Sequence, residues 1–160
     1  MHSTRIDLTA KGRTRMTGVL NARLADALDL QLQAKQAHWN VKGPSFIALH
    51  ELFDRIAGET AAHVDDIAER ITALGGVAEG TVQAVAGRTR LDVYPLHIVD
   101  GRSHLDALAA ALAKFGKAVR KAIDEAAKAG DADTSDLFTG ISRAADKNLW
   151  LVEAHLQADR

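Results

Sequence analysis

Cysteine is absent from this chain of 160 residues, and proline and aromatic residues are scarce. Without cysteine there can be neither a disulfide framework nor a thiolate metal site. No uninterrupted apolar run is long enough to span a bilayer, and the N-terminal segment lacks the apolar core of a signal peptide. We therefore expect a soluble, cytoplasmic protein that makes no membrane contact.

The chain also has no excess of positive or negative charge. The 20 lysines and arginines nearly balance the 21 aspartates and glutamates, for a formal net charge of -1. This balance gives no general reason to expect nucleic acid as a partner. The length is that of one domain, and such a domain buries about 70% of its unfolded surface, enough for a core without covalent staples.

The chain is rich in alanine and leucine at helical spacing. This pattern predicts four long helices, over about 14–41, 46–74, 103–129 and 134–158. The first helix is broken at "KGPS", where Pro44 cannot continue a helical ladder and Ser45 can cap the next helix. The second helix ends at Gly75-Gly76, a common C-terminal signal. The apolar stripes comprise Leu20, Leu24, Leu28, Leu32 and Lys35 in the first helix; Leu105, Leu108, Leu112, Phe115, Val119, Ala122 and Ala126 in the third; and Leu137, Ile141, Ala144, Leu151 and His155 in the fourth.

Residues 77–101 form a long connection with weak periodicity and a short helix predicted over "TVQAVAG" (81–87). A connection this long is uncommon in a compact domain, but it lets the second and third long helices of a four-helix bundle run parallel. The predicted fold is therefore all-α: a four-helix bundle over residues 14–160, with a short helix in the connection between helices two and three. Residues 1–13 are predicted to be a flexible arm.

A stripe of potential metal ligands runs along the second helix. It comprises His50, Asp54, Asp65 and Glu69, whose spacings of four and eleven residues return to nearly the same helical direction. Imidazole nitrogen with carboxylate oxygen suits iron, manganese or zinc. A solvated acidic face is the alternative interpretation of the carboxylates. The surrounding Phe46, Leu49, Leu52 and Phe53 argue against it, because they leave this helix little purely polar surface.

Distance separates the stripe into two pairs. Asp54 and Asp65 lie about 16 Å apart along the axis, at about 1.5 Å of rise per residue, so one metal cannot use both pairs from one helix. The Glu-x-x-His motif of internal di-iron bundles does not occur. Two copies of the helix that crossed antiparallel near Gly58 and Ala61 would join each pair to its complement in a two-fold dimer. The short break after the first helix can fold His38 back towards the second.

Two motifs carry a family resemblance: "AHWNVKGPSFIALHELFD" (37–54) and "HVDDIAERITALGG" (63–76) resemble the Dps proteins, the miniferritins named as DNA-binding proteins from starved cells. The likeness extends over nearly the whole chain, including "DVYP" (92–95) and "SRAADKNLWLVEAH" (142–155). It implies a ferritin-like bundle assembled from two-fold dimers into a shell of twelve. It also implies an intersubunit ferroxidase centre with His38, His50 and Asp54 from one subunit and Asp65 and Glu69 from its mate.

This resemblance implies an enzyme that oxidises Fe(II), preferably with hydrogen peroxide rather than dioxygen, stores ferric oxide in the shell and protects DNA from oxidative damage. Zinc would fit the same ligands. The competing hypothesis is a DNA-compacting, nucleoid-associated shell in which iron chemistry is secondary. A plain helical interaction module would leave five spaced ligands unexplained.

Three further groups of residues have two interpretations each. Trp39, beside His38, is either an interface aromatic or a quencher of stray oxidising equivalents. Asp131, Asp133 and Asp136 cap the last helix or, as the resemblance implies, line an iron-entry pore, and both can hold because the same carboxylates need not do both. The arm residues Arg5, Lys11, Arg13 and Arg15 either contact DNA, multivalently across many copies, or are idle. Structural roles are expected for His63, His97, His104 and His155.

Overall fold

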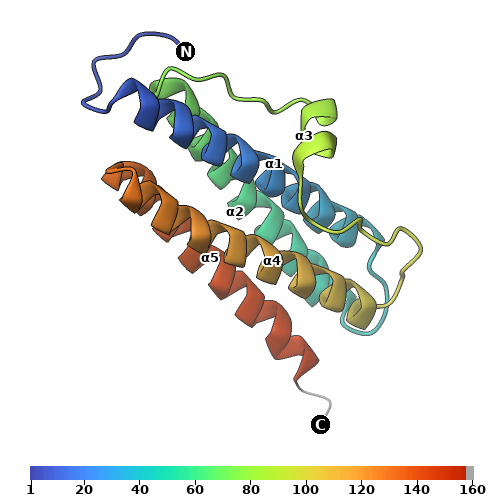
Figure 1. The fold of residues 1–160 in the computed structure, drawn as a ribbon. Coiled ribbons are helices and arrows are strands. Elements are labelled where there is room, and N and C mark those ends of the chain that lie inside the picture. The colour runs from blue at the N-terminus through green and yellow to red at the C-terminus, as the bar shows by residue number, and fades with distance from the viewer. Residues whose placement is uncertain (158–160) are drawn as a thin grey trace.

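Five helices and no β-strand occur in residues 1–157, the part of the chain described by the computed structural model. Four long helices pack side by side: α1 (Ala10–Asn40), α2 (Phe46–Ala73), α4 (Gly101–Lys128) and α5 (Ala132–Leu156). The short α3 (Val82–Arg88) lies outside them against α1 (Figure 1). The tightest pairings are α1 with α2 and α4 with α5. The predicted all-α four-helix bundle is confirmed, as is the short helix in the long connection.

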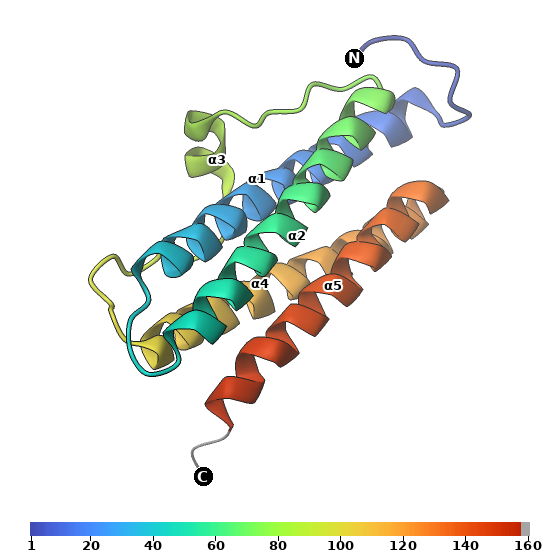
Figure 2. The same cartoon turned by 180° about the vertical axis from the view of Figure 1, so that it is seen from behind.

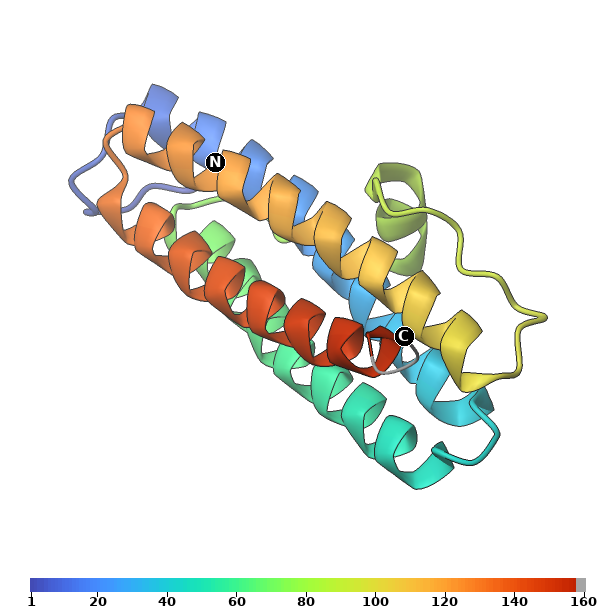
Figure 3. The same cartoon turned by 90° about the horizontal axis from the view of Figure 1, so that it is seen from below.

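The long connection runs back along the bundle, and α2 and α4 therefore point the same way, as Figures 2 and 3 also show. Four polar side chains of α1 hold the connection in place: Asn21, Asp26, Asp29 and Gln33. Asn21, for example, donates to the Val77 carbonyl at 3.0 Å and accepts from the Glu79 amide at 2.9 Å. This polar face explains why α1 is only weakly amphipathic.

The predicted face of α4 is buried throughout, whereas the stripe predicted for α1 turns outward. Leu20 and Leu24 are buried, but Leu32 is 56% exposed. Leucines four residues apart drift by about 40° per step on a helix of 3.6 residues per turn, so the leucine row leaves the core. In α5, Ile141 is buried while His155, at the end of its predicted stripe, is exposed.

The start of α2 is as predicted, and the other helix boundaries differ from the predicted ones by one to four residues, most at the N-terminus of α1. This helix begins at Ala10 because the Thr9 side chain accepts from the Gly12 amide at 3.0 Å, a cap that the sequence did not mark. Residues 10–13 of the predicted arm are therefore helical. Ser45 does occupy the N-cap position of α2, but its side chain makes no capping hydrogen bond. The predicted end of the last helix, residue 158, lies outside the described residues.

The turn after α2 depends on Gly75, whose φ of +86° is a left-handed conformation that L side chains rarely adopt. The His2 amide donates to the Gly75 carbonyl at 2.7 Å, which ties the start of the chain to this end of the bundle. No helix in the described range is both long and apolar enough to cross a membrane.

Candidate metal centre

His38 and His50 face each other across the sharp turn between α1 and α2. Their rings stack with centroids 3.7 Å apart and planes at 22°. Each Nδ1 lies 2.8 Å from the backbone carbonyl oxygen of the other histidine. A carbonyl oxygen only accepts, so both Nδ1 atoms must carry hydrogen. In the neutral rings both Nε2 atoms then keep their lone pairs, which is the tautomer that a metal requires.

Asp54 lies one helical turn beyond His50, and its Oδ1 is 4.0 Å from His38 Nε2. We define His38, His50 and Asp54 as the histidine half-site. The carboxylate also forms a close ion pair with Lys35 of α1. This hydrogen bond with Lys35 is the main cause that holds the pKa of Asp54 below its usual range. The carboxylate is therefore ionised and about half exposed, able to exchange a lysine ammonium for a metal cation.

Sequence reasoning missed the part played by Lys35, which it assigned to the apolar stripe of α1. A signal was present, because Lys35 and His38 are three residues apart and therefore share a helix face. Its pairing across to α2 could not be inferred, since it depends on how α1 and α2 pack.

Asp65 and Glu69, the acidic half-site, lie further along α2 and are exposed. The structure brings the histidine half-site together but does not bring the acidic half-site to it. Within residues 1–157 of a single chain, no group of three or more His, Asp or Glu side chains is placed to hold a metal ion. Any site that uses all five predicted ligands must therefore draw on a second chain.

A glycine lies on α2 between the two half-sites. Gly58 is exposed, and a Cβ built on it would meet no atom within 4 Å. Trp39, next to His38 in the sequence, is 65% exposed, and Ile47, three residues before His50, is 61% exposed. Small and apolar residues on one outer face allow a second helix to approach closely.

The three predicted pore aspartates divide by their contacts. Asp131 is 2% exposed. It accepts from the Thr134 amide at 3.0 Å and hydroxyl at 2.6 Å, and it pairs with Arg70 at 2.7 Å. Its carboxylate is therefore taken up by capping α5 and fastening α2 to it. Asp133 and Asp136 are exposed, and Asp136 borders a surface hollow with Gly130 and Thr139.

The basic residues predicted to contact DNA also differ in availability. Arg5, Lys11 and Arg15 are exposed. Arg13 instead donates to the Leu74 carbonyl at 3.2 Å and the His2 carbonyl at 3.4 Å, so its guanidinium holds the N-terminal segment against the end of α2.

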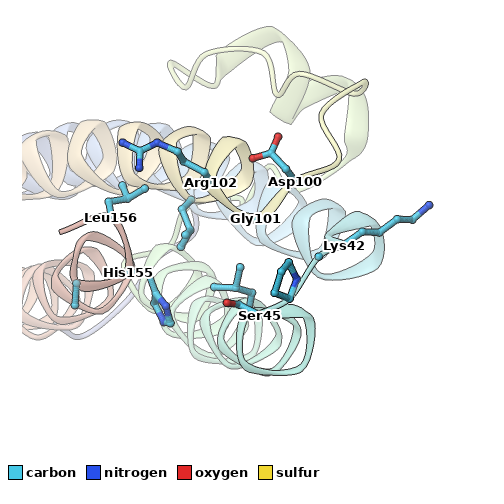
Figure 4. A pocket seen from close by; sticks show the side chains of 12 residues that line it. Lys42, Ser45, Asp100, Gly101, Arg102, His155 and Leu156 are labelled. Carbon is cyan, nitrogen blue, oxygen red and sulfur yellow. The ribbon is translucent and has the colours of Figure 1, made fainter. Parts of the chain in front are cut away.

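The remaining histidines occupy varied surroundings. His104 is buried beside Tyr94, while burial lowers the pKa of His63 in spite of the nearby Asp66 and Glu59 carboxylates. His97 is exposed in the long connection. His155 borders a hollow of about 520 Å³ at the end of the bundle, where the turn at Lys42, the start of α4 and the end of α5 meet (Figure 4). None of the five predicted ligands lines that hollow.

Comparison with known proteins places this geometry in context. A family model described as a ferritin-like domain matches residues 18–160. A "DNA protection during starvation protein" of Agrobacterium fabrum is 47% identical over 98% of this chain and 96% of its own length. The structure of DpsA14 from Streptomyces coelicolor superposes with a TM-score of 0.93 at 39% identity, covering 98% of this chain and 92% of that one. A Vibrio cholerae Dps structure, described as a member of a broad superfamily of ferritin-like diiron-carboxylate proteins, gives 0.91 at 25% identity, covering 98% of each chain.

Proposed function

The chain belongs to the ferritin-like Dps family, and from that premise we propose that it is a ferroxidase of iron storage and DNA protection. It oxidises Fe(II), preferably with hydrogen peroxide, and keeps the ferric oxide inside a hollow shell of twelve subunits. Membership of a diiron-carboxylate superfamily supports iron as the metal. Zinc is a substitute that the same nitrogen and oxygen ligands would accept.

The proposed site lies between two subunits related by a two-fold axis. The histidine half-site of one subunit meets Asp65 and Glu69 of the other, and the symmetry makes two such sites per dimer. The single observation that carries this proposal is the reciprocal hydrogen bonding of His38 and His50, which directs both Nδ1 hydrogens to backbone carbonyl oxygens and keeps both Nε2 atoms as the ring nitrogens that a metal can use, beside an ionised Asp54. The half-site is thus preset for a cation, yet it lacks enough ligands within one chain.

Oxidation follows from the charges around the iron. Carboxylates stabilise Fe(III) more than Fe(II) because each adds negative charge, and Glu69 is long enough to bridge two ions. Two ferrous ions give peroxide two electrons together: 2 Fe²⁺ + H₂O₂ + 2 H⁺ yields 2 Fe³⁺ + 2 H₂O. No hydroxyl radical is released, which a single ferrous ion would produce. Release of Lys35 from Asp54 on metal binding returns a positive charge to solvent.

Iron entry would use the exposed Asp133 and Asp136 at the start of α5, whose negative charge attracts cations. Asp131 is not available for this role in the described structure, since its carboxylate already bonds Thr134 and Arg70. Trp39 keeps both of its roles, because its exposure next to His38 suits an interface aromatic and a quencher of oxidants equally.

An anaerobic Fe(II) titration followed by peroxide tests the proposal, with the ferric product read by absorbance. The double variant His50→Ala, Asp54→Ala should lose fast oxidation while remaining assembled by light scattering. The matched control is Glu51→Ala, an exposed carboxylate on the same helix outside the ligand stripe, which should oxidise iron at the parent rate. If the double variant oxidises iron as fast as the parent, the site is wrongly assigned.

A second candidate function, DNA compaction by the shell in the nucleoid, is favoured by the exposure of Arg5, Lys11 and Arg15 at the N-terminal end of α1. Three cations per chain are few, but twelve copies on one shell would act together. Either function places the protein in the cytoplasm, where Fe(II), peroxide and DNA occur together.

A further inference from the structure

The end of the long connection and the first turn of α4, residues 98–104, pack against the segments that carry the histidine half-site. We call these residues the strap. The start of α4 faces the turn after α1 (Figure 4), and the Lys42 amide in that turn donates to the Val99 carbonyl at 3.0 Å. Gly101 lies so close to α2 that a Cβ built on it would come within 2.5 Å of Leu49 Cδ1. The strap therefore contacts both α2 and the turn that joins α1 to it.

The two residues of α2 that the strap contacts each precede a proposed metal ligand. Leu49 is followed by His50, and Phe53 is followed by Asp54. The ring of His104 lies 6.4 Å from the ring of Phe53, centroid to centroid. Leu49 and Phe53 are both buried, and buried side chains are close-packed. A movement of the strap is therefore transmitted to the backbone that carries both ligands.

His104 fastens the strap to the interior of the bundle. It is 1% exposed, and its Nδ1 lies 2.6 Å from the phenolic oxygen of the buried Tyr94. Burial lowers the pKa of the His104 imidazole, so the ring is neutral at neutral pH. Burial also raises the pKa of the Tyr94 phenol, which keeps its proton and donates it to Nδ1. Nε2 of His104 then carries the ring hydrogen, and within residues 1–157 it has no hydrogen-bond partner of normal geometry.

The groups that face the His104 ring compensate a positive charge on it only in part. The long connection presents the neutral phenol of Tyr94, and α2 presents an uncharged aromatic ring. Asp100, the N-cap of α4, raises the pKa of His104, as the Ile98 backbone does, but burial is the larger cause and lowers it. The Asp100 carboxylate already accepts from the Ser103 amide at 2.9 Å and hydroxyl at 2.6 Å. The packed strap therefore favours the neutral ring.

Protonation would break the hydrogen bond between the ring and the phenol. An imidazolium carries hydrogen on both nitrogens, so Nδ1 can no longer accept from Tyr94. The phenolic hydrogen would then be left without its acceptor, and a charge would be buried where little solvent reaches it. Both costs are relieved when the strap moves outward and water enters. The strap thus has a packed state with neutral His104 and a loosened state with charged His104.

We propose that His104 is a positioning residue for the histidine half-site, and that its protonation loosens the strap and weakens metal binding there. This inference rests on the proposed function for the place of the metal. Neutral His104 holds the strap against Leu49 and Phe53, which fixes the backbone at His50 and Asp54. Burial lowers the pKa of His104 from the ordinary 6.5, so the hold is complete at neutral pH. It is lost as the pH falls below that ordinary value, and acidification therefore favours release of the metal.

The test measures Zn(II) binding to the assembled protein by calorimetry, from neutral pH down to about pH 5. Zinc is the probe because it accepts the same ligands and undergoes no redox reaction. His104→Gln keeps an amide oxygen for Tyr94 but cannot titrate, whereas His104→Leu offers no acceptor. The matched control is His97→Gln, at an exposed histidine of the long connection. His50→Ala identifies the part of the binding that belongs to the half-site.

The affinity of the parent should fall with decreasing pH more steeply than that of His104→Gln, by up to about one proton per site. Protonation of the ligands themselves weakens both proteins equally, so the difference between the two slopes belongs to His104. At neutral pH the two should bind Zn(II) equally. His104→Leu should bind it more weakly even there, because the Tyr94 phenol is left unpaired. His97→Gln should match the parent at every pH.

A second measurement needs no variant. Tyr94 is the only tyrosine of the chain, so the tyrosine bands in ultraviolet resonance Raman spectra report its hydrogen bond alone. In the parent these bands should change as His104 is protonated, because the phenol stops donating to Nδ1. Coupling between two sites is reciprocal, so bound Zn(II) should move this titration to lower pH. Circular dichroism and light scattering check folding and assembly, and the Raman titration decides if a variant fails to assemble.

Three results would overturn the positioning role: equal slopes in the parent and His104→Gln, parental affinity in His104→Leu at neutral pH, or a tyrosine titration that Zn(II) does not shift. If the parent nevertheless oxidises Fe(II) rapidly with peroxide, the proposed function stands without it. Failure of the proposed function looks different. The parent then binds Zn(II) with the steeper pH dependence but does not oxidise Fe(II). Zinc binding that does not depend on His50 would refute both.

Discussion

The loss of Asp131 should cost the protein stability rather than iron uptake. In Asp131→Ala, the Thr134 amide and hydroxyl lose their acceptor, and Arg70 loses its partner at 2.7 Å. An N-cap is worth about 1 kcal/mol, and a hydrogen bond to a charged group about 1.5–3 kcal/mol. Because Asp131 is only 2% exposed, solvent screens this pair little. We therefore expect a total loss of about 3 kcal/mol.

The melting temperature gives a direct measurement. For a chain of this size, 1 kcal/mol corresponds to about 2–4 °C, so Asp131→Ala should melt on the order of 10 °C below the parent. The subunit concentration must be held fixed, since assembly contributes to apparent stability. Asp133→Ala is the matched control. Its side chain is 84% exposed and lies 3.8 Å from the same Arg70, so its melting temperature should move by roughly 1 °C or less.

The rate of iron uptake should respond to the exposed aspartates and not to Asp131. At a temperature where both variants stay folded, Asp131→Ala should take up iron at the parent rate. The double variant Asp133→Ala, Asp136→Ala should take it up more slowly because the exposed negative charge is gone. A variant of Asp131 that melts with the parent, or one that stays stable but stops iron entry, would refute the assignment of this carboxylate to the helix cap.

Three further outcomes are expected. Lys35→Gln removes the cation that lowers the pKa of Asp54, so that pKa should rise. Fe(II) should bind more tightly at neutral pH, because the lysine ammonium no longer competes for the Asp54 carboxylate. Unchanged Fe(II) affinity by anaerobic calorimetry would contradict this. Variants that lack the histidine half-site or the acidic half-site should each be inactive, and co-refolding should restore part of the activity; verified mixed dimers without activity would exclude a shared site. DNA retardation in a gel, if it occurs, should weaken steeply with salt and vanish on deletion of residues 1–9 together with neutralisation of Lys11 and Arg15. A shift that survives both treatments would place the contact on another surface.

The fold was predictable because its signals are local or periodic. The buried face of α4 follows from apolar residues at steps of three and four, and the end of α2 follows from Gly75. The start of α1 was not predictable to the same degree. Thr9 is one of several polar residues in a segment with no apolar rhythm, and only the folded backbone selects it as the cap.

Part of the candidate site was also predictable from the sequence. The positions of His50, Asp54, Asp65 and Glu69 on one stripe of α2 are fixed by helical geometry, which depends on spacing alone. Their separation along the axis is fixed by the rise per residue, so the sequence already implied that a site using both pairs needs a second chain.

Tertiary structure alone decided what depends on the contact of distant segments. The Nδ1 atoms of His38 and His50 each donate to the backbone carbonyl oxygen of the other residue. These two hydrogen bonds require the particular turn that joins α1 and α2, and they select the tautomer of both neutral rings. The pairing of Lys35 with Asp54 and of Tyr94 with His104 requires packing between elements that the sequence separates. Spacing along a chain determines which side chains share a face of one helix. Which faces meet, and at what distance, depends on how all the helices pack together.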